Sequence, residues 1–354
     1  MGALTATLSV PQVTVLMPVY NGSKYLEDAI ESILRQTYSH FEFLIINDGS
    51  TDDTPKILKS FAQYDKRIRL VNRDANHGLT SCLNLGLKIA MGRFIARMDA
   101  DDISLPERIE RQISFMENNP SVGICGSSVR WMENEKETIS QFPQDHKDIV
   151  CHNLFAPALA HPSVIMRKDA LAANSLKYST DYLYAQDYEF WTRCSRHMQM
   201  ANLNEILLVL RRHGDQISMT KNTSQLSAAR AIREEQLKGL DIIPSEDEKE
   251  LHEQISCGAW KSDRSFLMSA DTWMRKIITS NKTRYGYPEP ALSTVLANKW
   301  HVACAHATSL GLWTWTLYIH SPLSAYYSGD AKDRLSLAVR CLLRKGYWRT
   351  TINR

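Results

Sequence analysis

FIARMDADD, residues Phe94–Asp102, is a short apolar run that stops at three carboxylates within four positions, Asp99, Asp101 and Asp102. Such a run predicts a buried strand, and in open α/β sheets ligands bind beyond the carboxyl ends of the strands. Carboxylates this close repel one another unless a cation joins them, and a hard divalent cation carrying a phosphorylated substrate is the simplest candidate. The alternative is a helix start, because Ser104–Glu107 has capping-box spacing and acids favour helix N-termini.

Apolar runs alternate with helical periodicity through the first part of the chain. Val13–Val19 is an apolar run that ends in a loop containing Asn21-Gly22, and Phe41–Ile46 is a second run that ends at Asn47-Asp48-Gly49-Ser50. Ile68–Val71 is a short third run, and the segments between these runs carry apolar residues at helical spacing. This order predicts an α/β fold with a mostly parallel sheet flanked by helices.

The patterns continue beyond the carboxylates. They predict a helix over 106–118, a strand over 122–129, a loop with edge strands over 131–146, a strand beginning at 161, a helix beginning at 187 and a strand over 206–210. From about residue 224 onward the patterns are helical. We therefore expect a sheet domain over residues 1–220 and a helical C-terminal region over residues 221–354.

Composition narrows the class of protein. The net charge of +3 arises from charges of both signs spread along most of the chain, so nothing indicates a nucleic-acid partner. The seven cysteines form no C-x-x-C pair, which favours reduced thiols and a cytoplasmic location. The N-terminus lacks a signal-peptide layout and no apolar stretch reaches about 18 residues, so we expect no membrane-spanning segment.

Polar residues follow the predicted strands at the ends that would share one sheet edge. Tyr20-Asn21, Asp48 and Asp99–Asp102 follow three of them, and His161 and His213 accompany two later strands. We expect a single crevice to collect them. Neither G-x-G-x-x-G nor G-x-x-x-x-G-K-[ST] follows the first strand, which excludes the usual dinucleotide and P-loop sites.

Five motifs follow one another along the sheet domain: Met17-Pro18-Val19-Tyr20-Asn21, Ile46–Asp52, Asn76 and Gly78 ahead of Asn84, Ala90-x-Gly92-x-Phe94-Ile95, and Asp99–Asp102. In this order and spacing they resemble the family 2 glycosyltransferases, which have the GT-A fold. The resemblance covers about Val13–Ser218. Gln186–Trp191 looks like the family's catalytic-base segment, although members commonly have Glu where this chain has Gln186. Arg211-Arg212-His213-x-x-Gln216-x-Ser218 resembles its late histidine motif.

The resemblance implies an inverting transfer of one sugar from a nucleoside-diphosphate sugar, a UDP-sugar by preference, to a hydroxyl of a glycan acceptor. It implies that Asp187 is the catalytic base and that Asp101 and His213 bind Mn²⁺ or Mg²⁺. Nucleotide-sugar contacts are assigned in the same way to Pro18, Val19, Tyr20, Asn21, Asp48, Asn76, Gly78, Asp99 and Ala100, and acceptor or diphosphate contacts to His161, Gln186, Trp191, Arg211 and Ser218. The Q-x-x-R-W segment of processive members is missing, which favours single-sugar transfer.

Structural explanations compete with some of these assignments. Asp187 could only cap its helix, Asp48 could be a turn residue, and His161 before Pro162 could form a structural turn. Trp191 could pack rather than bind sugar, which is the commoner use of an aromatic residue.

Two other functions also compete. A nucleotidyltransferase that makes a nucleotide sugar needs metal-binding acids too, but its Gly-rich basic loop is absent where this chain has Tyr20–Ser23. A non-catalytic carbohydrate- or partner-binding module on the same fold is the third hypothesis.

Residues 330–354 are strongly basic, with seven Lys or Arg against two acids. Leu335, Val339, Leu342 and Leu343 recur at helical spacing within them. The segment could lie on an anionic membrane surface, at the inner face of the cytoplasmic membrane, and bring the enzyme to a lipid-linked glycan acceptor for surface polysaccharide synthesis. It could equally be a terminal helix docked on the protein. No pattern indicates an oligomeric state.

Overall fold

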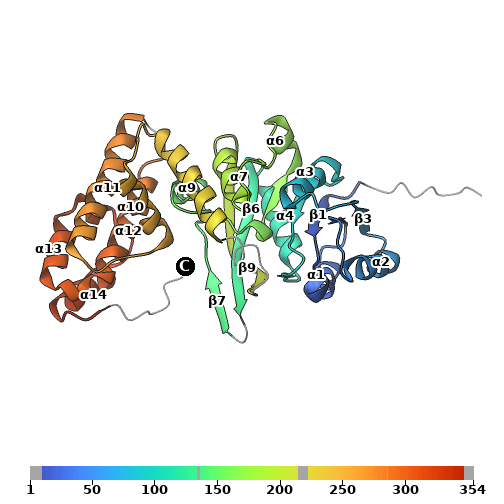
Figure 1. The fold of residues 1–354 in the computed structure, drawn as a ribbon, viewed down its shortest axis with the longest axis horizontal. Helices are drawn as coiled ribbons and strands as arrows, with labels where there is room; N and C mark the ends of the chain where they lie inside the picture. The colour runs from blue at the N-terminus through green and yellow to red at the C-terminus, as the bar shows by residue number, and fades with distance from the viewer. Residues whose placement is uncertain (1–9, 134–135, 214–221, 285, 347–354) are drawn as a thin grey trace, which may run out of the picture. The chain divides into compact units, whose positions relative to one another are not determined.

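The computed structural model describes residues 10–133, 136–213, 222–284 and 286–346 (Figure 1). These residues divide into two compact units. The first unit takes the described residues of Met1–Gln144 and Leu159–Asn222, and the second takes Asp145–Ala158 and the described residues from Thr223 onward. The short segment Asp145–Ala158 therefore groups with the helical part of the chain, although it lies within the predicted sheet domain in sequence.

Strands and helices alternate through the first unit. Its elements are β1 (Val13–Val19), α1 (Ser23–Leu34), β2 (Phe41–Asn47), α2 (Thr54–Tyr64), β3 (Ile68–Asn72), α3 (Leu79–Ile89), β4 (Phe94–Arg97), β5 (Ile103–Ser104), α4 (Arg108–Asn118), β6 (Val122–Glu133), β7 (Lys136–Ser140), β8 (Ile165–Arg167), α6 (Lys168–Ala173), α7 (Gln186–Cys194) and β9 (Gln199–Arg211). The predicted α/β alternation is confirmed.

The strands form one mixed sheet in the order β3-β2-β1-β4-β8-β6-β9-β5, with β7 paired to β6. β1 runs parallel to β2 and to β4, so that Val13 is in register with both Phe41 and Phe94. β8 lies antiparallel between β4 and β6, and β9 runs parallel to β6. One edge of the sheet therefore carries the C-terminal ends of β1, β2, β4 and β9 together with the N-terminal end of β8. Ligands of open α/β sheets bind at such an edge.

Helices cover both faces of this sheet. On one face, Ile30 of α1, Leu58 of α2 and Ile113 of α4 belong to the same buried cluster as the β1 residue Val15. On the other face α3 lies so close to β1 that a Cβ on Gly86 would be 2.3 Å from the Leu16 side chain. Burial on both faces explains why β1 and β2 are apolar along nearly their whole length.

Two predicted local structures are wrong. Ser104 does not open a helix but lies in β5, opposite Leu208 of β9, and α4 begins four residues later, after Pro106. Leu105 precedes that proline, and a residue in this position disfavours helical backbone. His161–Ser163 forms a 3-10 turn rather than a strand, because Pro162 has no N–H to give to a ladder.

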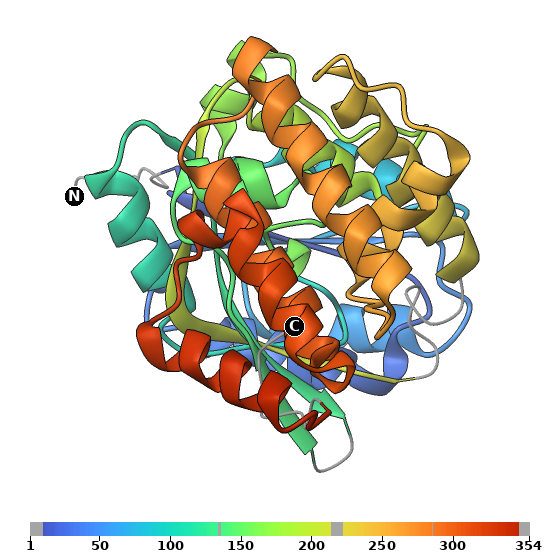
Figure 2. The ribbon, with the colours of Figure 1, turned by 90° about the vertical axis from the view of Figure 1, so that its left-hand side faces the viewer.

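The second unit is helical, as predicted for the C-terminal region. Its elements are α5 (His146–His152), α9 (Asn222–Lys238), α10 (Glu246–Cys257), α11 (Arg264–Arg284), α12 (Ala291–His306), α13 (Leu312–His320) and α14 (Ala331–Leu342). Figure 2 shows α11 to α14 in orange and red. Trp273 and Trp300 are buried at the centre of its core. Ser245 and Glu248 form a reciprocal capping box at the start of α10, which fixes where that helix begins.

Candidate active site

Three carboxylates gather directly beyond β4. Ligand oxygens of Asp99, Asp101 and Asp102 lie within 4.8 Å of one another. Asp99 accepts a hydrogen bond from the guanidinium of Arg97, and Asp101 Oδ2 lies 2.9 Å from Nε2 of His213. Asp102 is buried, whereas Asp99 and Asp101 are partly exposed. The cluster is therefore open to a ligand on the side of Asp99 and Asp101.

The surroundings of these carboxylates disfavour negative charge. Burial raises the pKa of Asp99 to about 6; the charge of Arg97 opposes the rise, and the charges of Asp101 and Asp187 add to it. Burial, together with the charges of Asp99 and Asp101, also raises the pKa of Asp102 well above its usual value. A nearby cation would favour the ionised forms. Since carboxylate oxygens and an imidazole are donors that Mg²⁺ and Mn²⁺ accept, this donor set fits the predicted metal.

Asp102 has a structural role that the sequence did not indicate. Its Oδ1 accepts a hydrogen bond of 3.1 Å from the backbone N–H of Arg211, at the end of β9. Since α4 begins only at Arg108, the alternative that these acids directly precede a helix start is wrong for Asp102. Asp102 instead ties the loop after β4 to the strand that carries the late histidine motif.

The end of β9 brings Arg211 and His213 to the carboxylates. Arg211 Nη2 lies 2.6 Å from Asp28 on α1, and the guanidinium lies 5.1 Å from the ring centre of Tyr25. The same tyrosine ring is 4.7 Å from the ring of His213. These contacts hold His213 beside Asp101 and give Arg211 an anionic partner within the protein. Ser218, the last residue assigned by resemblance, lies outside the described residues.

Two buried arginines under the carboxylates were missed by the sequence analysis. Arg97, the last residue of β4, pairs with Asp99, and Arg108 donates a hydrogen bond of 2.6 Å from Nη2 to the carbonyl oxygen of Arg97. Burial, with the charge of Arg97, lowers the pKa of Arg108 to about 9 against the opposing charges of Asp102 and Asp99. The two cations offset part of the negative charge of the cluster. An arginine at the end of an otherwise apolar strand was the signal that could have revealed the first of them.

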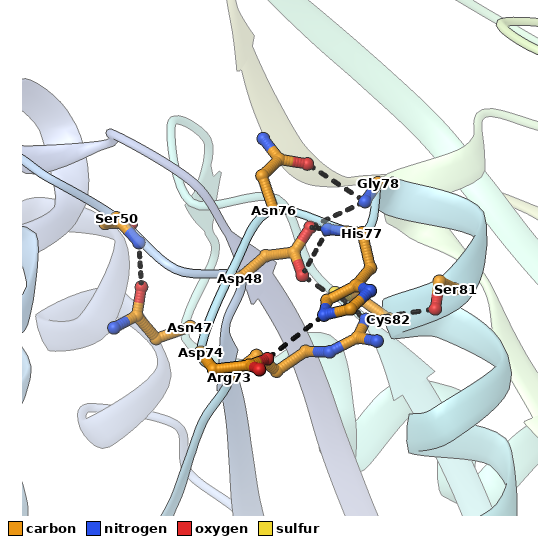
Figure 3. A network of polar contacts seen from close by, with 10 residues as sticks. All are labelled: Asn47, Asp48, Ser50, Arg73, Asp74, Asn76, His77, Gly78, Ser81 and Cys82. Carbon is orange, nitrogen blue, oxygen red and sulfur yellow. Dashed lines mark hydrogen bonds and ion pairs between the residues drawn. The ribbon is translucent and has the colours of Figure 1, made fainter.

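Asp48 organises the loop that follows β3 (Figure 3). Its carboxylate accepts hydrogen bonds from the backbone N–H of Gly78 at 2.8 Å and of His77 at 3.1 Å, and it lies 3.3 Å from Nη1 of Arg73. Asn76 adds a side-chain contact to the same Gly78 N–H. Because Asp48 is almost fully buried, the structure gives it the task of fixing the 76–78 backbone at the sheet edge.

The loops after β1 and β2 are joined to each other. Asn21 has a positive φ of 48° and accepts a hydrogen bond of 2.8 Å from the N–H of Thr51, while its own N–H donates to Ser50 Oγ. Pro18 and Val19 are the last residues of β1, and Tyr20 follows them with 48% of its surface exposed. The nucleotide contacts predicted from Pro18 to Asn21 and from Asp48 to Gly78 thus come from neighbouring loops of one edge.

Asp187 lies in the first turn of α7, directly after the buried Gln186. Burial raises the pKa of Asp187, and the positive charge of Arg97 and a backbone hydrogen bond in the helix turn work against the rise. The charge of Asp187 in turn adds to the raised pKa of Asp99. A raised pKa is one property that a general base needs for proton transfer near neutral pH.

His161 and Trp191 belong to a buried aromatic cluster. His161 Nε2 lies 3.0 Å from the hydroxyl of Tyr178, and burial, with the charge of Arg97, lowers the pKa of His161 well below its usual value. Trp191 packs on His161 and Phe190 with no exposed surface. In this structure Trp191 therefore presents no face to a sugar, and the packing alternative describes it. His161 is a neutral side chain beneath the site.

Comparison with known proteins gives this geometry a context. Residues 14–171 match the sequence model described as glycosyl transferase family 2. An uncharacterized glycosyltransferase of Haemophilus influenzae is 36% identical over 248 residues, which cover 66% of this chain and 77% of that protein. The amylovoran biosynthesis glycosyltransferase AmsE of Erwinia amylovora is 32% identical over 220 residues, covering 61% of this chain and 82% of that protein.

The fold has a counterpart among crystal structures. S. aureus TarS 1–349 in complex with UDP-GlcNAc superimposes with a TM-score of 0.56 at 16% identity, covering 96% of this chain and 93% of that chain. At this identity the likeness concerns the fold, and it agrees with the GT-A architecture expected from the sequence motifs.

Proposed function

The chain belongs to glycosyl transferase family 2, and from this premise we propose that it is a metal-dependent, inverting enzyme that moves one sugar from a UDP-sugar to a hydroxyl of a glycan acceptor. The observation that carries the proposal is the carboxylate cluster of Asp99, Asp101 and Asp102 with His213 beside it, next to the carboxyl group of Asp187. The UDP-GlcNAc bound to a protein of the same fold supports the choice of donor.

The leaving diphosphate is the first chemical problem of such a transfer, because negative charge builds on it as the sugar departs. We assign Asp101 and His213 to the ligands of Mn²⁺ or Mg²⁺, with Asp99 on the nucleotide side. The metal would supply charge neutralisation at the diphosphate. Pro18 to Asn21, Asp48, Asn76, Gly78 and Ala100 are assigned to the nucleotide and sugar, Asp48 acting through the backbone N–H groups of the 76–78 loop that it fixes.

The acceptor hydroxyl is the second problem, because it is a poor nucleophile at neutral pH. We assign Asp187 to take its proton during attack, as a carboxyl group whose pKa is raised is better matched to proton transfer near neutrality. Gln186 and Arg211 are assigned to contacts with the acceptor or the diphosphate. His161 is assigned to the packing beneath the site. Attack opposite to the leaving group inverts the anomeric centre.

The product's stereochemistry tests this mechanism. With a UDP-sugar that is α-linked to the nucleotide, we expect a β-linked product, identified from the anomeric proton coupling in the NMR spectrum of the purified glycan. Product formation should stop when the divalent ion is chelated. An α-linked product would exclude direct displacement with Asp187 as the base.

We further propose that the acceptor belongs to surface polysaccharide synthesis, is carried on a lipid, and is met at the inner face of the cytoplasmic membrane. The amylovoran biosynthesis enzyme among the relatives supports the pathway class. None of the helices among the described residues is both long and apolar enough to cross a membrane. We assign contact with the lipid surface to α14.

The basic C-terminal segment was explained either as a membrane-surface helix or as a helix docked on the protein, and α14 has features of both. Its residues Leu337 and Cys341 are buried in the core of the second unit. Leu335, Val339, Leu342 and Leu343 remain 64%, 44%, 64% and 54% exposed. A helix that docks through one face and exposes an apolar stripe among basic residues has the pattern of an interfacial helix.

Vesicle co-sedimentation of the full chain tests the membrane contact. Leu335→Ser with Leu342→Ser should weaken binding to anionic vesicles about 30- to 150-fold, since two exposed apolar side chains together contribute roughly 2 to 3 kcal/mol of transfer free energy. Ile243→Ser, at an 88% exposed apolar position outside α14, is the matched control and should pellet as the wild type does. Equal pelleting of all three proteins would contradict the assignment.

A further inference from the structure

Two cationic side chains contact the same phenylalanine in the second unit, where no function has been assigned. Arg233 of α9 is only 5% exposed and donates a hydrogen bond from Nη1 to the carbonyl oxygen of Phe155 at 3.4 Å. Lys299 of α12 places Nζ 4.4 Å from the ring centre of the same phenylalanine. Arg233 and Lys299 thus contact one residue from two helices, and the charge of Arg233 acts on Lys299.

This pair of cations lacks an anionic partner within the part of the chain that the structure describes. Arg233 Nη2 is buried and has no hydrogen-bond partner there, and no carboxylate lies within ion-pair distance of Arg233 or Lys299. A neighbour on the same helix shows the contrast, since Arg230 lies within 3.3 Å of Glu234 and 2.9 Å of Glu246. An unpaired buried charge is costly, and proteins usually keep one only where something binds it.

A neighbouring histidine adds no charge to this pair. His252 stacks on Phe155, and its two ring nitrogens are used by Trp273 Nε1 at 3.1 Å and by the carbonyl oxygen of Leu154 at 3.0 Å, which leaves a neutral imidazole. Burial lowers the pKa of Lys299 to about 8; the charge of Cys257 opposes the fall, and the charge of Arg233 adds to it. Burial, with the charge of Lys299, lowers the pKa of His152 at the end of α5, so this histidine also adds no positive charge near neutral pH.

We propose that Arg233 and Lys299 form an oxyanion site for a phosphoryl group, the unpaired Nη2 of Arg233 being the donor at its buried end. Guanidinium groups bind phosphate through paired N–H donors and an ammonium adds a point charge, so the two residue types complement each other. On the proposed function, on which this last step rests, the phosphoryl group belongs to the carrier of the glycan acceptor.

Calorimetric titration of the full chain with inorganic pyrophosphate tests the site. The titration is run in excess chelator and without nucleotide, so that its result does not depend on sugar transfer. Wild-type protein should bind, and Arg233→Gln and Lys299→Gln should each weaken binding at least tenfold. Arg230→Gln, which removes a paired arginine of the same helix, is the control and should bind as the wild type does. Farnesyl diphosphate, titrated in parallel, shows whether the phosphoryl group comes from a lipid or from a soluble compound. Tighter binding than pyrophosphate assigns the site to a lipid carrier, and equal binding assigns it to a soluble phosphate.

Folding of the variants is followed by thermal unfolding. Removal of an unpaired buried charge should leave the melting temperature of Arg233→Gln unchanged or raised. If that variant unfolds early, Lys299→Gln provides the comparison, because Lys299 is only half-buried. Absence of pyrophosphate binding by the wild type, or equal binding by the wild type and a folded variant, would overturn the proposal whatever the outcome of the transfer assays.

Discussion

Asp101→Ala is expected to lower metal-dependent release of UDP from a UDP-sugar about a hundredfold or more, because the variant removes an assigned metal ligand and with it charge neutralisation at the diphosphate. Asp101 is the carboxylate that approaches His213, at 2.9 Å, and it is partly exposed, so a ligand can reach it. The measurement is the rate of UDP release with and without Mn²⁺.

The thermal stability of Asp101→Ala separates loss of metal from loss of fold. Without metal its melting temperature should not fall, since the substitution removes one of three mutually repelling acids. Added Mn²⁺ should stabilise the wild type and not the variant. Asp181→Ala, at an exposed acid elsewhere in the first unit, is the matched control and should keep full activity. Wild-type rates in Asp101→Ala would contradict the metal assignment.

Asp187→Asn is expected to lower the rate of sugar transfer about 10² to 10⁴-fold, the usual contribution of a positioned general base. Its fold should be at least as stable as that of the wild type at pH 7. Burial raises the pKa of Asp187, so the ionised carboxylate is less favourable in the folded protein than in the unfolded chain. The resulting cost is present above the folded pKa and disappears as the pH falls below the unfolded pKa. An amide carries no such cost.

The pH dependence offers a second measurement on the same residue. As the pH is lowered, kcat/KM should fall with an apparent pKa above the ordinary pKa of an aspartate. The base must be ionised, and burial opposes its ionisation. Glu189→Gln is the control on the same helix. It removes the 2.7 Å ion pair with Arg193 and should change stability without changing kcat more than a few-fold. Transfer by Asp187→Asn at near wild-type rates would show that another group takes the proton.

Much of the sheet could be predicted because local patterns decide it. Val13–Val19 was predicted and found with the same bounds, because an apolar run and the turn after it mark the strand locally. Pairing between distant segments was not readable in this way. β9 extends back to Gln199 because it pairs along β6, and β5 exists only because two residues meet β9. Such partners depend on tertiary packing, which overrides local propensity.

For the candidate site, the topology was predictable and the charge balance was not. Motifs at strand ends predicted that Asp48, Asp101 and His213 would share an edge, since parallel strands end together. No motif indicated that Arg108 would lie beneath them, and for Trp191 the pattern left packing and sugar binding open. Those outcomes depend on burial, which a spacing pattern does not report.

The most direct measurement of the central claim is thermal stabilisation of the wild-type chain by a panel of nucleotide sugars, with Mn²⁺, with Mg²⁺ and with chelator. The account predicts that a UDP-sugar raises the melting temperature in the presence of a divalent ion, that the rise disappears in chelator, and that Asp101→Ala shows none. Failure of every nucleotide sugar to stabilise the protein with metal present, or equal stabilisation in chelator, would contradict the assignment of the β4 carboxylates to a metal-dependent donor site.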